Sequence, residues 1–599
     1  MSTISNVLVA NRGEIALRII RGVHDYGASA VAVYADQDRD ASFVSAADQA
    51  FSLDGTTPAQ TYLDADKLLQ IAQRSGADAI HPGYGFLAEN PDFAAAVVDA
   101  GLTWIGPAAQ SILALGDKVQ ARQVAERVGV NPVPGTNEPL TSRSEVESFV
   151  AKWGYPIVLK RADGGGGRGI SVIANDTDLD QFFSGRDEET LGAFFVERFV
   201  QRARHIETQC GRDSFGTFAV YSTRDCSLQR RHQKLIEEAP APFVTPEVEA
   251  QLHDASQRLF EGVDYVGLGT CEFLLDQDNN LYFLEVNPRL QVEHTVTEEV
   301  SGLDLVGQQL QIAAGLPLTL PPQTRGHSIE LRITSEDPAN GLAPSLGTLN
   351  RIDWPTGPGV RIDTGVVVGD SVTPDFDSMI AKIIVTGQDR TQALSRARRA
   401  LKDLQIEGVA TPIPLYQEIL DRPEFAGDDL LIWTRWMEDV FLPQFTPAET
   451  EKPDLTAGAA AVETAAPLQR FAIEIDGRRH ELALPFGAFG AGVIGAAADA
   501  PRQPQPLRSQ REGIRTMQTV KQHPDVVASP LQAIVVRVCV TSGDRVEEGD
   551  LVLVMESMKM EKYVHAHRSG EIDEVLVTTG DNVSPNQALV RLVTSGEEN

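Results

Sequence analysis

The chain has 599 residues, of which 42% are hydrophobic and 23% are charged. These proportions are typical of a globular protein, and the length predicts several domains rather than one core. The formal net charge is −32. That charge argues against nucleic acid or an anionic membrane surface as a partner, because binding either one needs a basic surface.

Four cysteines are scattered along the chain: Cys210, Cys226, Cys271 and Cys539. They are too few for a disulfide framework and lack the CxxC spacing of a metal site. The first residues show no signal-peptide pattern, and no apolar run reaches the length that spans a membrane. We therefore expect a cytoplasmic protein in a reducing compartment.

Residues 6–115 alternate short apolar segments with helical ones. Val7–Ala10 and Ala30–Tyr34 are predicted strands, and Glu14–Gly22 between them is a predicted helix. This order is typical of a parallel sheet. A Gly-x-Gly-x-x-Gly fingerprint does not follow the first strand, so dinucleotide binding is not indicated. The alternation of strands and helices continues to about Phe445.

A glycine-rich segment, Gly164–Gly169, follows a predicted strand at Pro156–Lys160. Its successive backbone N–H groups could bind phosphate oxygens while the segment closes as a lid. The alternative is an ordinary flexible loop. A Walker-type Gly-x-x-x-x-Gly-Lys-Ser/Thr sequence is absent, so this is not a P-loop.

Acidic residues face each other in a predicted hairpin formed by Thr270–Asp276 and Leu281–Glu285. A turn over residues 277–280 pairs residue i with 557 − i, which places Glu272 opposite Glu285. Two such carboxylates repel each other unless a cation lies between them. With Asn287 on the same face, the oxygen ligands suit Mg²⁺. The alternative is an exposed acidic hairpin without a metal.

The last 150 residues divide into linkers and small β units. Residues 446–467 and 488–523 are rich in Ala, Pro and polar residues without a periodic apolar face, which is typical of linkers. Between them, residues 468–487 predict a β-hairpin with its tight turn at Asp476-Gly477. Residues 524–599 form the last predicted domain.

This last domain contains an internal repeat. Val538–Val546 aligns with Val575–Val583 at an offset of 37 residues, and each half alternates apolar residues before a Gly-Asp turn. Two such halves predict a small sandwich, with Lys559 at a hairpin tip between them. Lys559 lies between Met558 and Met560, which favours covalent biotin over lipoate; the plain alternative is a snorkelling surface lysine.

Four motifs together resemble the biotin carboxylases of the ATP-grasp superfamily: Val9–Ile15, His81–Leu87, Arg224–Lys234 and Glu285–His294. With the Met-Lys-Met domain, the chain resembles the alpha subunit of actinobacterial-type acyl-CoA (acetyl- or propionyl-CoA) carboxylases over about residues 5–445 and 524–599. The resemblance implies a mixed α/β and α+β chain. Its parts would be a Rossmann-like domain at 1–117, an ATP-grasp domain with a glycine-rich lid at 118–325, a biotin carboxylase C-terminal domain at 326–445, and an all-β biotinyl (lipoyl-like) sandwich at 524–599.

The resemblance also implies a reaction and its residues. ATP phosphorylates bicarbonate, and the resulting carboxyphosphate delivers CO₂ to biotin. Glu293 would be the general base, Lys234 and Arg289 would bind bicarbonate, and Arg332 would stabilise the biotin enolate. Glu272, Glu285 and Asn287 would hold Mg²⁺ or Mn²⁺. The implied ATP-binding residues are Lys118, Lys160, Gly164, Gly165, Gly166, Gly167, Glu197, His205, Gln229 and His232.

The sequence departs from the family pattern in several places. Thr295 stands where proline is common, Ser557 replaces an alanine near the target lysine, Pro530–Ala533 replaces a Pro-Met-x-Gly turn, and the segment between Gly169 and His205 is shorter than usual. The shorter segment before His205 affects the expected lid, and the changes at Pro530–Ala533 and Ser557 lie in the domain that carries Lys559.

No carboxyltransferase half is visible, so we expect a separate beta subunit, together with biotin protein ligase and an oligomeric complex, as partners. The acceptor is open: an acyl-CoA is expected, and pyruvate is the alternative. Two other interpretations are a carbamoyl-phosphate-forming ATP-grasp ligase fused to a lipoyl-like domain and a non-catalytic biotin-carrying scaffold. The first has no use for the methionines around Lys559, and the retained carboxylates and arginines argue against the second.

Overall fold

The structure is a computed structural model. It describes residues 4–136, 138–161, 170–184, 194–446, 468–475, 478–485, 525–530, 533–557, 560–583 and 587–593. The predicted phosphate-binding glycines Gly164–Gly167, the predicted biotin site Lys559, and the two predicted linkers, except for Thr446 at the start of the first, lie outside the described residues.

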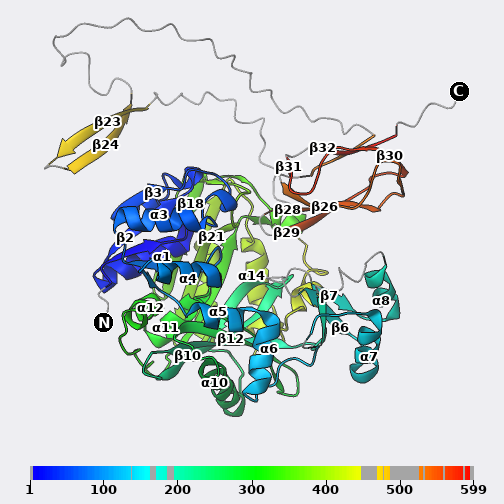
Figure 1. The fold of residues 1–599 in the computed structure, drawn as a ribbon, viewed down its shortest axis with the longest axis horizontal. Coiled ribbons are helices and arrows are strands. Elements are labelled where there is room, and N and C mark those ends of the chain that lie inside the picture. Colours follow the sequence, from blue (N-terminus) through cyan, green and yellow to red (C-terminus); the bar gives the residue numbers. More distant parts are fainter. Residues whose placement is uncertain are drawn as a thin grey trace, which may run out of the picture. The chain divides into compact units, whose positions relative to one another are not determined.

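The N-terminal part is a parallel five-stranded sheet in the order β3-β2-β1-β4-β5, drawn in blue in Figure 1. Its strands are β1 (Asn6–Val9), β2 (Ser29–Tyr34), β3 (Gln49–Ser52), β4 (Ala79–His81) and β5 (Thr103–Trp104). Helices α1 (Gly13–Tyr26), α2 (Ser42–Ala46), α3 (Ala65–Ser75), α4 (Pro91–Asp99) and α5 (Ala109–Gly116) connect or follow them. The predicted parallel sheet is confirmed.

Helix α1 forms because its apolar residues recur every three or four positions. Ile15, Ile19 and Val23 are fully buried against the sheet. Gly27 ends the helix in the left-handed conformation, with φ of 88°, where a side chain would be strained. At the other end, Glu14 in the first turn of the helix is buried and lies 3.3 Å from Nζ of Lys382 on β21 (Met379–Gly387).

The central element is an antiparallel eight-stranded sheet in the order β13-β12-β9-β10-β11-β14-β21-β19. Its strands are β9 (Arg204–Arg212), β10 (Phe218–Arg230), β11 (Gln233–Ala239), β12 (Gly267–Leu275), β13 (Leu281–Asn287), β14 (His327–Thr334), β19 (Val360–Thr364) and β21 (Met379–Gly387). Because β11 pairs with β14, the sheet runs without interruption across the expected domain boundary at residues 325 and 326.

Helices pack on this sheet: α6 (Lys118–Arg127), α10 (Pro246–Glu261), α11 (His294–Ser301), α12 (Leu305–Ala313) and α13 (Arg390–Asp403). Helix α14 (Ile413–Asp421) packs on α13, and α15 (Pro423–Ala426) packs on α14. Short strands complete the C-terminal part: β15 (Glu336–Asp337), β16 (Ala343–Pro344), β17 (Gly347–Thr348), β18 (Arg351–Asp353), β20 (Ser371–Val372) and β22 (Gln405–Glu407). A π-helical turn at Met437–Phe441 closes it.

A separate three-stranded sheet has the order β7-β6-β8. It comprises β6 (Ile157–Arg161), β7 (Ile170–Ile173) and β8 (Phe194–Arg198), with α7 (Arg143–Trp153) and α8 (Asp176–Phe183) packed on it. The predicted strand that ends in Lys160 is therefore confirmed as β6.

The predicted hairpin between the linkers is also present. Strands β23 (Leu468–Ile475) and β24 (Arg478–Pro485) pair antiparallel, with Ile475 opposite Arg478. Two residues separate these partners, as a tight turn requires. The hairpin belongs to a unit of its own, residues 449–526.

The last domain has two four-stranded sheets, β25-β32-β30-β27 and β29-β28-β26-β31. Its strands are β25 (Val526–Ala528), β26 (Ala533–Val538), β27 (Arg545–Val546), β28 (Leu551–Ser557), β29 (Met560–His565), β30 (Gly570–Val575), β31 (Asn582–Val583) and β32 (Ala588–Leu592). Adding 37 to the bounds of β26 and β27 gives those of β30 and β31. The predicted repeat and the sandwich fold are confirmed.

The repeat extends to the hydrogen bonds of its turns. The backbone N–H of Thr541 donates to Asp544 at 2.7 Å, and that of Thr578 donates to Asp581 at the same distance. Gly543 and Gly580 adopt φ of 93° and 96° before these aspartates. The two halves therefore use one local sequence to make one turn.

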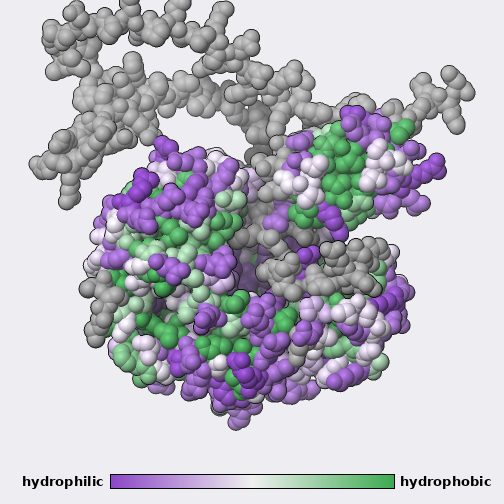
Figure 2. All heavy atoms as spheres, viewed as in Figure 1, coloured by the Kyte–Doolittle hydropathy of each residue, from purple (hydrophilic) through white to green (hydrophobic). Residues whose placement is uncertain are grey.

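The surface is mostly polar, as the composition of the chain predicts. Hydrophilic residues cover much of the visible face, with smaller apolar areas between them (Figure 2). Among the described residues, no helix combines the length and apolarity needed to cross a membrane. All four cysteines are unpaired, and Cys210, Cys226 and Cys271 are buried.

Candidate active site

The acidic hairpin has the predicted pairing at its functional end. Glu272 on β12 lies opposite Glu285 on β13, and Thr270 lies opposite Asn287. Nearer the turn the predicted register is wrong: a bulge after Glu272 shifts the pairing, so that Phe273 lies opposite Phe283. The extra residue in β13 leaves the carboxylate pair in place while the turn closes one residue earlier.

Lys234 lies at the centre of three carboxylates that come from distant parts of the chain. Its Nζ is 3.0 Å from Oε1 of Glu272 and 2.7 Å from Oε1 of Glu293, and it also contacts Glu207. These partners are on β12, at the start of α11 and on β9. The sheet thus converts four separate sequence segments into one buried charged centre.

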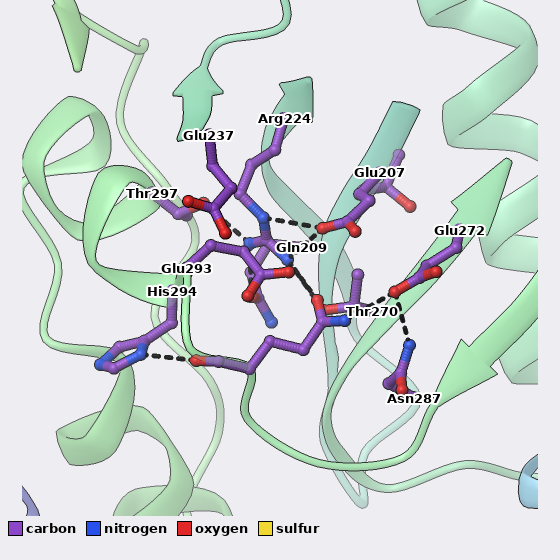
Figure 3. A network of polar contacts seen from close by, with 12 residues as sticks. Glu207, Gln209, Arg224, Glu237, Thr270, Glu272, Asn287, Glu293, His294 and Thr297 are labelled. Atoms are coloured by element: carbon purple, nitrogen blue, oxygen red, sulfur yellow. Dashed lines mark hydrogen bonds and ion pairs between the residues drawn. The ribbon is translucent and has the colours of Figure 1, made fainter. Parts of the chain in front are cut away.

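Arg224 connects further members of this centre. Its guanidinium, which is fully buried, donates to Glu207 at 3.1 Å, Gln209 at 2.8 Å and Gln291 at 2.7 Å. In Figure 3, Glu207 and Glu293 lie on either side of this guanidinium. A buried arginine with this many acceptors fixes the position of each one.

The charges of the centre shift the pKa values of its carboxyls. Burial by itself raises the pKa of Glu293, but Lys234 and Arg332 outweigh it and lower the value to about 2. The same balance, dominated by Lys234, lowers the pKa of Glu207 to about 2. Glu293 is therefore an ionised proton acceptor held beside two cations.

The second cation at Glu293 is Arg332 on β14. Its Nη2 lies 2.9 Å from Oε2 of Glu293, and its Nε donates to Glu237 at 2.5 Å. Arg289 lies elsewhere in the centre, where it donates to Asn287 at 3.0 Å and pairs with Glu89 at 3.0 Å. Glu293 is thus in direct contact with both Lys234 and Arg332. Arg289 is connected to Lys234 indirectly, through hydrogen bonds that involve Asn287 and Glu272.

The predicted ATP residues on β9 and β10 are next to this centre. His205 Nε2 lies 2.9 Å from Glu272, and its Nδ1 lies 3.2 Å from Nε2 of Gln229. Burial by itself lowers the pKa of His205, but Glu272 and Glu207 outweigh it and raise the value to about 10. His232 lies in the turn between β10 and β11, with φ of 64°, so it does not share a strand face with Gln229.

Two other predicted ATP residues, Lys160 and Glu197, lie on neighbouring strands of the small sheet. Lys160 on β6 forms an ion pair with Glu197 on β8, and Arg122 on α6 lies 3.0 Å from the same carboxylate. Lys118 is the first residue of α6. Burial lowers the pKa of His232 to about 4, and the charge of Lys160 adds to this effect.

Glu272, Glu285 and Asn287 fit a divalent cation. Burial and the negative charge of the neighbouring Glu272 raise the pKa of Glu285. Asn287 donates through Nδ2 to Glu272 at 2.8 Å, so it orients that carboxylate. One ligand atom each of His205, Glu207 and Glu272 also lies within 4.8 Å of the others, so these three residues form a second candidate set of metal ligands.

Sequence reasoning missed several residues of the centre: Glu89, Glu207, Glu237, Arg224 and Gln291. A signal for one of them was present. His205, Glu207 and Gln209 alternate with Ile206 and Cys210, and such alternation places the polar three on one face of a strand. Glu237 and Gln291 gave no such signal, because their partners are distant in sequence.

Family models match four parts of the chain. "Biotin carboxylase, N-terminal domain" matches residues 3–112, and "Carbamoyl-phosphate synthase L chain, ATP binding domain" matches 117–320. "Biotin carboxylase C-terminal domain" matches 330–439, and "Biotin-requiring enzyme" matches 522–592. The expected ATP-binding and biotin domains are confirmed.

Two relatives illustrate the range of similar proteins. The biotin-dependent acyl-coenzyme A carboxylase alpha3 subunit of Mycobacterium leprae is 45% identical over 600 residues, which is 99% of each chain. A pyruvate carboxylase subunit of Methanothermobacter thermautotrophicus is 40% identical over 71% of this chain and 88% of its own.

A solved structure shows the same fold. The biotin carboxylase domain dimer of Hydrogenobacter thermophilus 2-oxoglutarate carboxylase, in complex with MgADP, ADP and bicarbonate, superimposes with a TM-score of 0.71 at 39% identity. The match covers 75% of this chain and 100% of that one. The chain therefore belongs to the biotin carboxylase family, in the form that joins a biotin carboxylase to a biotinyl carrier domain.

Proposed function

We propose that this chain is the alpha subunit of an acyl-CoA carboxylase. It would use ATP and bicarbonate to carboxylate biotin attached to Lys559, and a separate beta subunit would transfer the carboxyl group to an acyl-CoA. The observation that supports the carboxylation step most strongly is the contact of Glu293 with both Lys234 and Arg332.

We also propose the seven-part division of the chain with boundaries after residues 117, 325, 445, 467, 487 and 523.

The centre suggests how these residues act. Glu293 is ionised and would accept the proton of bicarbonate, while Lys234 and Arg289 would hold the anion. Arg332 would then donate to the negative charge that develops on the biotin ureido oxygen. Mg²⁺ bound at Glu272 and Glu285 would neutralise phosphate charge during transfer. The MgADP and bicarbonate of the Hydrogenobacter structure support this choice of substrates.

An acyl-CoA is the favoured acceptor because the acyl-CoA carboxylase relative matches a larger share of this chain than the pyruvate carboxylase relative does. The Mycobacterium leprae alpha3 subunit matches over 99% of this chain, which includes the carrier region. The match to the Methanothermobacter pyruvate carboxylase subunit covers 71%. Pyruvate is therefore the second candidate acceptor, and the carboxyltransferase partner would decide between them.

One experiment tests both steps. The purified full chain with Mg·ATP is expected to release ADP only when bicarbonate is present, and added free biotin should increase the turnover. A panel of acetyl-CoA, propionyl-CoA, longer acyl-CoAs and pyruvate, added together with a candidate beta subunit, then identifies the acceptor. Avidin should detect the wild-type chain and not Lys559→Arg. Carboxylation of an acyl-CoA by the chain alone would contradict the division into two subunits.

A further inference from the structure

The segment that places Glu293 is fixed by groups outside the reacting set. Residues 288–293 join β13 to α11, and Glu293 is the residue immediately before that helix. The carbonyl of Val292 accepts a hydrogen bond from Nζ of Lys382 at 3.0 Å. Two residues after Glu293, the hydroxyl of Thr295 donates to Glu330. The base is thus held on both sides along the chain.

Lys382 is placed by the sheet. It lies on β21 directly opposite Arg332 on β14, so the lysine that holds Val292 and the arginine that contacts Glu293 are cross-strand neighbours. Its side chain is 0% exposed, and Nζ lies 3.3 Å from Oε2 of Glu14 on α1. A buried lysine is costly unless it is paired and hydrogen-bonded, and these two contacts satisfy it.

Glu330 is similarly enclosed. It lies on β14 opposite Glu237, and both residues are fully buried. Its Oε1 has no hydrogen-bond partner within the described part of the chain, whereas its Oε2 accepts from Thr295. The Thr295 hydroxyl is therefore the contact that orients this carboxylate and ties the first turn of α11 to β14.

We propose that Lys382 and Thr295 are positioning residues, which hold the backbone on both sides of Glu293 so that its carboxylate stays between Lys234 and Arg332. The inference rests on the proposed function, because it assigns a role to residues that support the proposed base. It also gives a purpose to Thr295, which stands where the family pattern has proline: a proline has no hydroxyl to donate.

The physical requirement is strict. A proton acceptor contributes only when it lies within hydrogen-bond reach of the proton that it removes, and a misplacement of about 1 Å can cost about 100-fold in rate. If these two contacts only stabilised the fold, removing them would lower Tm without changing the turnover of the folded enzyme. The two roles therefore give different kinetics.

The test uses matched variants of the full chain. Thr295→Val removes only the hydroxyl, Thr295→Ser restores it, and Lys382→Met removes the amine at similar length. Thr364→Val is the control, because the Thr364 hydroxyl donates to the carbonyl of Ile380 at 2.8 Å on the neighbouring strand β21 and, within the described part of the chain, forms no hydrogen bond to residues 292–295. Each variant is measured for Tm, for the Kd of Mg·ATP, and for kcat of bicarbonate- and biotin-dependent ADP release.

We expect Thr295→Val to lower kcat at least tenfold, by the sensitivity to misplacement, with the Kd of Mg·ATP within about twofold of wild type. Thr295→Ser should recover most of the rate, and Lys382→Met should lose at least as much as Thr295→Val. Thr364→Val should lower Tm alone. The proposal is overturned if Thr295→Val keeps the wild-type kcat or if Thr364→Val loses as much. A wild-type chain without bicarbonate-dependent ADP release would instead overturn the proposed function. Should Lys382→Met fail to fold, the Thr295 pair still decides.

Discussion

The carboxylase centre and the carrier domain are built on opposite principles. In the carrier, two similar sequence segments 37 residues apart form similar strands and turns around an apolar core that includes Val552, Leu589 and Val590. In the centre, ionised side chains from β9, β11, β12, β14 and α11 meet in a buried space. Local sequence makes the first, and long-range strand pairing makes the second.

The carboxylase centre and the carrier domain should therefore respond differently to a single substitution. A buried ion-pair network leaves an uncompensated charge when one member is removed, so its members depend on one another. A turn in the carrier depends mainly on its own residues. Changes in the centre should therefore be large and coupled, and changes in the carrier turns small and local.

The largest effect is expected for Glu293→Gln. An amide cannot accept the bicarbonate proton, so bicarbonate-dependent ADP release should fall about 10²–10⁴-fold, the usual contribution of a positioned base. The Kd of Mg·ATP should stay close to wild type. Glu285→Gln is the matched comparison, in which the dependence on Mg²⁺ itself should weaken. Wild-type turnover in Glu293→Gln would refute the assignment of the base.

A smaller effect concerns the pH dependence of stability. The pKa of His205 is raised to about 10 in the folded protein, so its contribution is complete below the unfolded value of about 6.5 and is lost as pH rises through 10. Between pH 8 and 9 the free energy of unfolding should therefore fall by up to about 1.4 kcal/mol per pH unit.

His205→Gln should remove that slope. The measurement is urea denaturation of both chains at pH 8.0, 8.5 and 9.0 in metal-free buffer. Glu237, with a pKa raised to about 8 by burial, titrates in the same window in both chains, so the contribution of His205 is the difference between their two slopes. Parallel curves for the two chains would contradict the protonated state of His205.

The smallest effects are expected in the carrier. Asp544→Ala and Asp581→Ala each remove the acceptor of one threonine N–H in equivalent turns. Each should increase hydrogen exchange in its own half of the sandwich, measured in the full chain, by a similar and modest factor. Asp573→Ala, on the exposed face of β30, is the control. Loss of the entire domain from one substitution would contradict the local character of these turns.

Much of the fold was predictable because its signals are local. The parallel order of the N-terminal strands, the strand at Lys160, the hairpin at residues 468–485 and the 37-residue repeat all follow from short-range alternation and turn residues. The pairing of Glu272 with Glu285 across the hairpin was also predictable, from the number of residues between them and the turn. The bulge after Glu272 did not, because an extra residue in one strand leaves no mark in an apolar pattern.

The centre itself was predictable only in part. Individual residues such as Lys234, Glu293 and Arg332 were found through their motifs. Glu207, Glu237 and Lys382 were not given a role, since each one acts through a partner that is tens to hundreds of positions away in the sequence.

The sequence by itself determined the local structures of this protein, because hydrophobic period, turn residues and repeats act over a few positions and need no partner elsewhere. It also determined the family, through long motifs that lie within single segments. Only the tertiary structure decided the charge state of Glu293 and His205 and the neighbours of Lys234 and Lys382. The reason is that a pKa and an ion pair depend on burial and on distances of about 3 Å, which strand pairing between distant segments sets.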